Sequence, residues 1–501
     1  MRHRLIVPAA VLAALTLAVP ASAAEPAPGA PGAGDPYYPE YGNGGYDVSH
    51  YDLQLKYRPK TDELAGTATL LGRTTQDLSR FNLDFALEVS EVRVNGRKAT
   101  TATSGAHELE VTPAEPLAKG EDFTVVVRYA GVPSEVEVHG FTSWMRTPDG
   151  AVAANQPESA WWWYPSNDHP SDKATFDISI TVPKGTDALS NGTLRSTTTT
   201  PAGTRTRWRS HKPQATYLAT LAVGKFDITK STTESGIPVV TAYSEDLGED
   251  AGAARASLER TSEVTDWLEG VFGPYPFNSV GGYVPNTKVG FALETQTMPF
   301  YGRKRFERGS DVPVVVHELA HQWYGDSVSV RKWRDIWLNE GFATYASWLW
   351  SEHQGEGTAQ ELADYVYSLY PADDDFWTVK PGDPGPENQF HGAVYDRGAM
   401  ALQALRNEIG DKDFFAVLKG WPAEHSGGNA RVRDFVRYAE KMSGEPLTEL
   451  FDTWLYQPSK PAASALGGER AAAGKAERAP QTPPKSWRKI AAVNGSHGHR
   501  R

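Results

Sequence analysis

The residues best suited to chemistry lie in the segment Val314–Trp323, which contains the pattern His-Glu-x-x-His. On a helix, positions i and i+4 share one face, so His317 and His321 could place both imidazoles on one metal ion. Glu318 lies beside the first histidine and could reach a water molecule on that ion, as a general base would. The segment therefore predicts a metal site that activates water.

A helix is expected here because favourable capping residues precede the histidines. Ser310 and Asp311 are good N-caps, and Pro313 suits the first turn of a helix. The apolar run that follows is typical of a buried helix, and burial would keep the metal site dry.

A third ligand is available further along the chain. Eighteen residues separate His321 from Glu340, which opens a second apolar helical segment. Two histidines and one carboxylate leave a fourth position for water, which is the arrangement of a catalytic rather than a structural zinc site. The chain has no cysteine, so any such site must use nitrogen and oxygen ligands.

These two motifs together resemble the M1 family of zinc aminopeptidases, the aminopeptidase N and leukotriene A4 hydrolase group. The likeness lies in the histidine motif, its spacing to Glu340, and the run Asn339-Glu340-Gly341-Phe342-Ala343. It implies a zinc-dependent metalloprotease that removes N-terminal residues from peptides. It also implies one Zn²⁺ per chain, held by His317, His321 and Glu340, with Glu318 as the catalytic base.

A third segment resembles the family's Gly-x-Met-Glu-Asn motif, which lies on the edge strand of the active site. Phe291, Leu293 and Thr295 depart from that motif, whereas Glu294 is kept, 23 positions before His317. The resemblance implies that Glu294 binds the free α-ammonium of the substrate.

Two further site residues follow from the resemblance. Tyr395-Asp396-Arg397-Gly398 is similar to the family's Tyr-Glu-Lys-Gly, which implies that Tyr395 stabilises the oxyanion. The run Pro165–Pro170 resembles a family segment with a proline, an acid and a second proline, and in the family a Gln or Glu about ten residues before the first proline helps to hold the amino group. Counting back from Pro165 gives Gln156, with Glu158 as the alternative if the loop is shifted.

Carboxylates outside the ligand set are expected to orient the histidine ligands, because metal-bound imidazoles usually donate their second N–H to such a partner. Asp326 is a candidate for this role.

The elements that must position these residues fall into two domains, of α+β class overall. Alternating segments such as Tyr46–Tyr57, separated by turns such as Asn95-Gly96, predict an all-β domain over residues 37–232. Helical patterns follow, and most of residues 245–272 is predicted to form one helix. Residues 233–460 are therefore expected to form a thermolysin-like, mainly helical zinc metallopeptidase domain, as the resemblance also implies.

The two ends of the chain differ from its body. Arg2 and Arg4 precede an apolar run and a small-residue cleavage pattern, which predicts a signal peptide over residues 1–24 and secretion. Residues 25–36 are rich in Pro, Gly and Ala and are expected to be a flexible lead-in. Residues 461–501 carry eight Lys or Arg against two Glu and are expected to be a basic disordered tail. The chain is therefore expected to be a short, two-domain form without the large helical C-terminal domain of many relatives.

Composition limits the partners. The chain has 501 residues, 40% hydrophobic and 22% charged, with a formal charge of −12, which is typical of a globular protein and argues against nucleic acid. Stable membrane insertion is not expected. The expected partners are peptides with a free N-terminus, and the oligomeric state and preferred N-terminal side chain stay open.

Three alternatives remain at this point. A zinc endopeptidase of thermolysin type would share the metal chemistry. A non-catalytic peptide-binding protein on an M1 scaffold would be expected to lose a ligand or the base, and none is lost here. A lipid epoxide hydrolase activity, known in one branch of the family, is neither favoured nor excluded.

Overall fold

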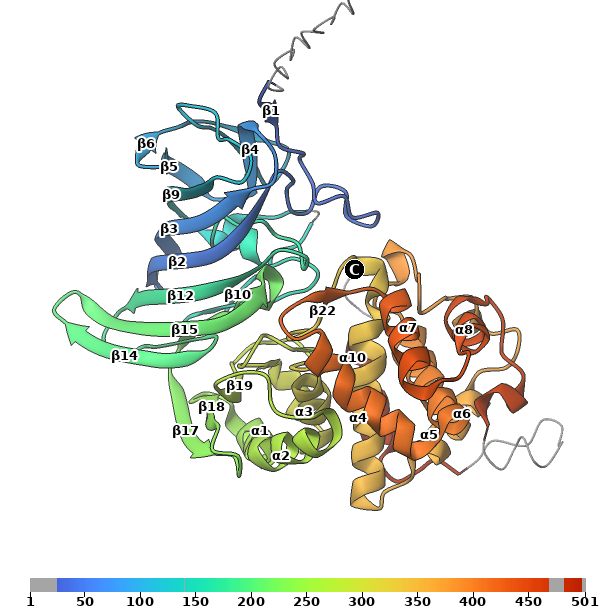
Figure 1. The fold of residues 1–501 in the computed structure, drawn as a ribbon. Helices are drawn as coiled ribbons and strands as arrows, with labels where there is room; N and C mark the ends of the chain where they lie inside the picture. The colour runs from blue at the N-terminus through green and yellow to red at the C-terminus, as the bar shows by residue number, and fades with distance from the viewer. Residues whose placement is uncertain (1–24, 139, 468–481, 498–501) are drawn as a thin grey trace, which may run out of the picture.

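The computed structural model describes residues 25–138, 140–467 and 482–497. Strands make up the N-terminal half and helices dominate the second half (Figure 1). This division confirms the predicted fold class, an all-β domain followed by a mainly helical one.

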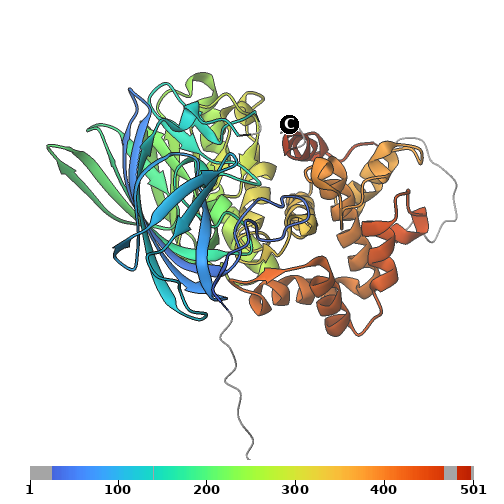
Figure 2. The same cartoon turned by 90° about the horizontal axis from the view of Figure 1, so that it is seen from above.

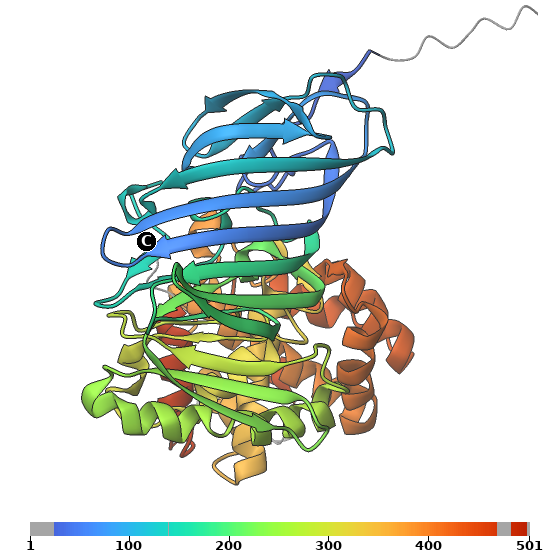
Figure 3. The same ribbon diagram turned by 90° about the vertical axis from the view of Figure 1, so that its left-hand side faces the viewer.

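The largest element is an eight-stranded sheet in the order β14-β15-β12-β2-β3-β9-β5-β6. Figure 3 looks onto one face of it. Its β2 alternates buried and exposed residues, as the sequence pattern predicts. The turn Asn95-Gly96 has positive φ at both residues, which is the conformation a two-residue hairpin requires, and it joins β5 to β6. The strands are β2 (Tyr46–Arg58), β3 (Glu63–Thr74), β5 (Glu88–Val94), β6 (Arg97–Lys98), β9 (Asp122–Gly131), β12 (Lys173–Val182), β14 (Thr193–Thr200) and β15 (Gly203–Ala215).

Two four-stranded sheets complete the N-terminal domain, and their inner faces share one apolar core with the large sheet. The first has the order β1-β4-β8-β7 and the second the order β10-β11-β16-β13. Their strands are β1 (Ala27–Pro28), β4 (Leu78–Asp84), β7 (Thr100–Ser104), β8 (Glu108–Thr112), β10 (Trp144–Arg146), β11 (Ala151–Ala153), β13 (Asp187–Ser190) and β16 (Leu221–Gly224).

The second domain opens with a five-stranded sheet in the order β17-β18-β19-β21-β20, so β20 lies at its edge. Its strands are β17 (Phe226–Thr232), β18 (Pro238–Ser244), β19 (Val280–Val284), β20 (Ala292–Leu293) and β21 (Phe300–Tyr301). Because β17 pairs with β18, the boundary lies between Gly224 and Phe226 rather than at 232. The sequence of β17 resembles the sequences of the strands before it, so it could not show by itself which sheet this strand joins.

Helices pack behind this sheet, with α4 packed against both α3 and α6 (Figures 1 and 2). The region 245–272 forms two helices rather than one, and α6 contains a break at Gly410, where φ is 76°. The helices are α1 (Ala251–Leu258), α2 (Thr261–Phe272), α3 (Val312–Ala320), α4 (Trp337–Gln354), α5 (Ala359–Leu369), α6 (Gly392–Glu424), α7 (Val432–Ser443), α8 (Thr448–Phe451) and α10 (Trp487–His497). A two-stranded sheet of β22 (Ser329–Val330) and β23 (Asn429–Ala430) lies among them.

The expectation of a flexible lead-in over residues 25–36 is wrong. Asp35 is buried, accepts a hydrogen bond from the backbone N–H of Trp333 at 2.9 Å, and lies 3.1 Å from His169. Lys332 donates to the carbonyl of Ala33 at 2.7 Å. The segment is therefore held by residues distant in the sequence, which its own composition does not reveal.

The expectation of a disordered tail is also wrong for residues 482–497, which include α10. Ile490 and Val493 are buried against the helical domain, and Arg305 donates to the carbonyl of Ala492 at 2.6 Å. The rest of the predicted tail beyond 467, and the predicted signal peptide over 1–24, lie outside the described residues. None of the helices in the described ranges has the length and apolar character needed to cross a membrane.

Candidate active site

The helix that carries the histidine motif begins where the sequence predicts. Asp311 is its N-cap, with its side chain accepting from the N–H of Val314 at 3.3 Å, and Pro313 lies in the first turn. Every residue of α3 is buried, which makes it a central helix of the domain.

The three predicted metal ligands come together. His317 lies in α3, His321 follows its last residue, and Glu340 is in the first turn of α4. Nε2 of His317 and Nε2 of His321 each lie 3.4 Å from Oε2 of Glu340. All three side chains are buried.

This geometry fits a metal ion. Tetrahedral zinc with ligand bonds of about 2.1 Å separates its donor atoms by about 3.4 Å, which matches both distances. Oε2 of Glu340 is buried and accepts no hydrogen bond within the described part of the chain. This oxygen atom faces the two imidazoles. The donor set therefore suits Zn²⁺.

Burial and charge give the ligands their protonation states. Burial lowers the pKa of His317 to about 4, which keeps this imidazole neutral, the form that binds metals. Burial opposes charging of His321 as well, but the carboxylates of Glu340 and Glu294 outweigh it and raise the pKa to about 10, so a bound metal ion takes the place of the proton on Nε2. Burial would raise the pKa of Glu340, yet the two histidines hold it well below its usual range.

A backbone carbonyl orients His321. Nδ1 of His321 lies 3.0 Å from the carbonyl oxygen of Tyr324, so an N–H at Nδ1 leaves the lone pair of Nε2 for the metal. Asp326 does not take the orienting role expected of it. Its carboxylate oxygens form no hydrogen bond with any described residue, and only its backbone N–H reaches His321, at the carbonyl oxygen.

The candidate base lies beside the ligands. Glu318, Glu294 and His321 bring ligand-type atoms within 4.8 Å of one another. Burial raises the pKa of Glu318 well above its usual range, and the charges of Glu294 and Glu340 add to this. A carboxylate with a raised pKa is suited to taking up a proton and passing it on.

Glu294 lies directly after β20, the edge strand, as the sequence resemblance implies. It is buried, and Gln156 donates from Nε2 to Glu294 Oε1 at 2.9 Å. The hydroxyl of Tyr217 donates to the same oxygen at 3.2 Å. Gln156, from the N-terminal domain, thus meets Glu294, from the catalytic domain.

Glu158, the alternative to Gln156, lies elsewhere. Its side chain is buried beside the hydroxyl of Tyr41, whose pKa is raised by burial and by this carboxylate. Of the two candidates, Gln156 is the one whose hydrogen bond to the carboxylate of Glu294 is observed.

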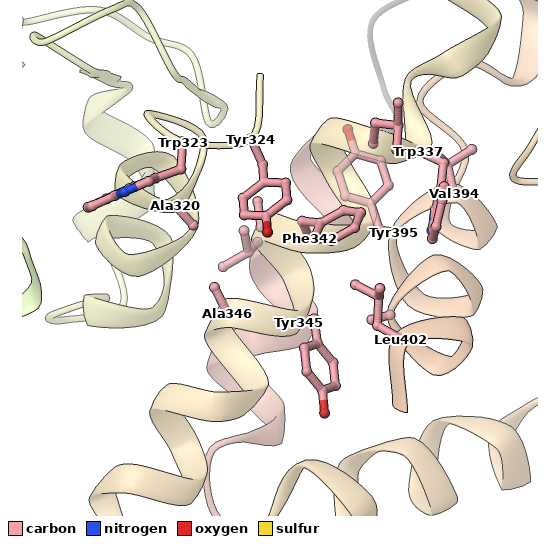
Figure 4. Close-up of a cluster of buried hydrophobic side chains, with 14 of the residues drawn as sticks. Ala320, Trp323, Tyr324, Trp337, Phe342, Tyr345, Ala346, Val394, Tyr395 and Leu402 are labelled. Carbon is pink, nitrogen blue, oxygen red and sulfur yellow. The ribbon is translucent and has the colours of Figure 1, made fainter. Parts of the chain in front are cut away.

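Tyr395 lies in the first turns of α6, with its ring centroid 6.1 Å from that of His317. Figure 4 shows it among apolar side chains of α4 and α6, including Trp337, Phe342 and Val394. Arg397 of the same motif is fully buried and fixes this part of the helix. Its guanidinium donates to the backbone carbonyls of Trp377, Val379, Thr453, Trp454 and Gln457.

Sequence reasoning missed three residues near the site. Tyr217 contacts the carboxylate of Glu294, and the side-chain amide of Gln322 donates to the backbone carbonyl of Glu294 at 3.2 Å. Lys173 donates to the carbonyls of Asp326 and Ser327 at 2.7 and 2.9 Å, in the loop that follows His321. Gln322 could have been noticed as the neighbour of His321, whereas Tyr217 and Lys173 carry no local signal.

Two family models match the chain. The Peptidase M1 N-terminal domain covers residues 48–218, and the Peptidase family M1 domain covers residues 303–454. Glutamyl aminopeptidase of Bos taurus is 26% identical over 455 residues, which is 82% of this chain and 46% of that protein. Aminopeptidase M1 of Arabidopsis thaliana is 28% identical over 338 residues, which is 63% of this chain and 38% of that protein. The chain spans about half the length or less of these curated relatives.

Solved structures match over nearly their full length. An M1 zinc metallopeptidase of Deinococcus radiodurans, in a mutant bound to a Tyr-Ser-Ala substrate, superposes with a TM-score of 0.77 at 29% identity. The match covers 86% of this chain and 99% of that one. A two-domain M1 zinc metallopeptidase mutant bound to L-tryptophan gives a TM-score of 0.75 at 28% identity, covering 91% and 99%. With both domain models, the metal triad and these folds in agreement, the chain belongs to the M1 family of peptidases.

Proposed function

We propose that this protein is a zinc-dependent aminopeptidase, a hydrolase that removes N-terminal residues from peptides. The observation that carries the proposal is the position of Glu294, whose carboxylate lies in one buried cluster with Glu318 and His321. A carboxylate at a fixed place beside the metal ligands is the group needed to bind a charged α-ammonium. The relatives' aminopeptidase names support the same conclusion.

The chain's own groups divide the work. His317, His321 and Glu340 would hold one Zn²⁺, which supplies Lewis-acid polarisation of the scissile carbonyl and of water. Glu318 takes a proton at its carboxylate and delivers it to the leaving amine. Tyr395 donates a hydrogen bond to the developing oxyanion, a contribution typically worth about 3 kcal/mol.

Substrate binding rests on Glu294 and Gln156. The carboxylate of Glu294 pairs with the free α-ammonium, and the amide of Gln156, already hydrogen-bonded to Oε1, holds that carboxylate in place. An acylated nitrogen cannot form this ion pair, so blocked peptides are excluded. The partners are therefore peptides with a free N-terminus.

Secretion also belongs to the proposal. It is supported by the charged start, apolar run and small-residue pattern of residues 1–24. The test is mass spectrometry of the N-terminus of protein recovered from the culture medium. Secretion would be contradicted if the protein were found only in the cells, with its N-terminus intact.

A panel of single-residue aminoacyl reporter substrates, each with and without an N-acetyl block, tests the proposed activity. An aminopeptidase hydrolyses the free amines and spares the blocked ones. A thermolysin-type endopeptidase would instead cleave internal bonds of doubly blocked peptides, and a binding protein on this scaffold would bind peptides without turnover.

A further inference from the structure

A second cluster of metal-binding side chains lies in the N-terminal domain, outside the site described above. Asp84 ends β4 and Glu108 begins β8, and these two residues are direct partners in the antiparallel pair. His107 precedes Glu108 in the turn before β8. One ligand atom from each of the three residues lies within 4.8 Å of the other two.

The central pair of this cluster is buried with no hydrogen bonds at the facing atoms. Asp84 is 0% exposed and His107 is 3% exposed. Oδ1 of Asp84 lies 3.4 Å from Nδ1 of His107, and neither atom forms a hydrogen bond with a described residue. The other oxygen of Asp84 accepts from the N–H of Asp168 at 2.7 Å and from Asn43 at 3.1 Å. These contacts fix the carboxylate, so that Oδ1 points into the cluster.

The cluster combines two acidic side chains with a single basic one. Two carboxylates face one imidazole, and no Lys or Arg of the described segments forms an ion pair with Asp84 or Glu108. Both carboxylate oxygens of Glu108 are buried, with the Asn82 amide beside them. Buried carboxylates without a compensating charge are costly, whereas a divalent cation balances two of them.

We propose that Asp84, His107 and Glu108 form a second, structural cation site that takes Zn²⁺. One imidazole with two carboxylates suits zinc and similar first-row metals, whereas Ca²⁺ and Mg²⁺ favour oxygen ligands alone. The 3.4 Å between Oδ1 of Asp84 and Nδ1 of His107 equals the two donor separations in the active-site triad. It also matches the spacing of about 3.4 Å that tetrahedral zinc imposes.

The site would brace the segment that follows Gln156. The backbone of Asp84 pairs with Ser166 in both directions, at 2.8 and 3.1 Å. The ring of His107 stacks on Trp161, with centroids 4.0 Å apart and an interplanar angle of 8°. A cation bound here therefore ties β4 and β8 to the stretch 161–168, and its role is to hold that stretch in place rather than to react.

Zinc counting on the full chain tests the proposal. The protein is saturated with Zn²⁺ and then dialysed against metal-free buffer to remove unbound ions. Elemental analysis should then find about two zinc ions per chain in the wild type. The double variant His317→Ala/His321→Ala, which removes the active-site ligands, should keep about one. His107→Phe, which preserves the ring stacked on Trp161, should also keep about one, because only the second site loses a ligand.

Two further variants guard against a folding defect. Glu108→Gln keeps the shape of the side chain and should also lose about one zinc ion, whereas Glu110→Gln on the same strand should keep both. Added Zn²⁺ should raise the melting temperature of the active-site double variant, and His107→Phe in that background should abolish the rise. The proposal would be overturned if the active-site double variant bound no zinc. It would also be overturned if His107→Phe and Glu108→Gln kept the wild-type zinc count, and Asp84 and His107 would then be an ordinary ion pair.

Discussion

At the scale of single residues, neighbouring carboxylates of one buried site are given different roles by their surroundings. Two histidines hold the pKa of Glu340 below its usual range, so it stays an ionised ligand. Burial and the nearby charges of Glu294 and Glu340 instead raise the pKa of Glu318. Groups whose pKa values are pushed apart in this way can serve as ligand and as base side by side.

Replacing the base should separate metal binding from turnover. Glu318→Gln keeps the size of the side chain but cannot take a proton, so activity should fall by at least about 100-fold. Zinc content should stay at the wild-type level, because Glu318 is not a ligand. His317→Ala is the contrasting variant and should lose both the active-site zinc and the activity. A Glu318→Gln enzyme with a rate near that of the wild type would rule out this base.

At the scale of elements, the sequence predicted those that local signals define. The Asp311 cap and Pro313 mark the start of α3, and Asn95-Gly96 marks a hairpin, so both were predicted correctly. The lead-in around Asp35 and the helix α10 were not, because distant contacts order them. The hydrogen bond from Tyr217 to Glu294 spans 77 positions and is invisible in the sequence for the same reason.

The packing of α10 makes a prediction that the sequence alone would not make. Ile490 is 1% exposed, and α10 contacts α3, α4 and α6. Ile490→Ala should lower the free energy of unfolding by about 2 kcal/mol or more, since buried Ile→Ala changes usually cost about 2–5 kcal/mol. Urea unfolding measures it, with the exposed neighbour Lys489→Ala as control. Equal midpoints for the two variants would show that α10 contributes no packing energy.

At the scale of the whole molecule, the active site depends on contacts between the two domains. Gln156 reaches Glu294 from the N-terminal domain, and Asp35 accepts from the backbone of Trp333. Lys173, at the start of β12, donates to the carbonyls of Asp326 and Ser327 in the loop after His321. The β domain therefore contacts both the loop beside the proposed metal site and the proposed ammonium-binding residue Glu294.

Removing the interdomain donor Lys173 should lower the stability of the folded protein. Lys173→Met removes one donor from the carbonyl of Asp326 and one from that of Ser327, which keep the hydroxyl of Ser329 and the N–H of Gly427. Each lost hydrogen bond typically costs about 0.5–1.5 kcal/mol. The melting temperature should fall, and the active-site zinc should exchange faster as the loop after His321 loosens. Lys184→Met, an exposed lysine just after β12, is the matched control. Identical melting curves for the two variants would show that the hydrogen bonds of Lys173 between the domains do not stabilise the protein.

The proposed aminopeptidase activity requires selection of a free amine, and this selection is assigned to Glu294. Its most direct test is the ratio of kcat/KM for a free aminoacyl substrate to that for its N-acetyl form, compared between wild type and Glu294→Ala. In Glu294→Ala, kcat/KM for the free amine should fall by the equivalent of about 2–4 kcal/mol in transition-state free energy, as expected when a buried charge partner is removed. Zinc should be retained and the ratio should shrink towards one. A Glu294→Ala enzyme that keeps both its rate and its preference for the free amine would show that Glu294 does not bind the α-ammonium.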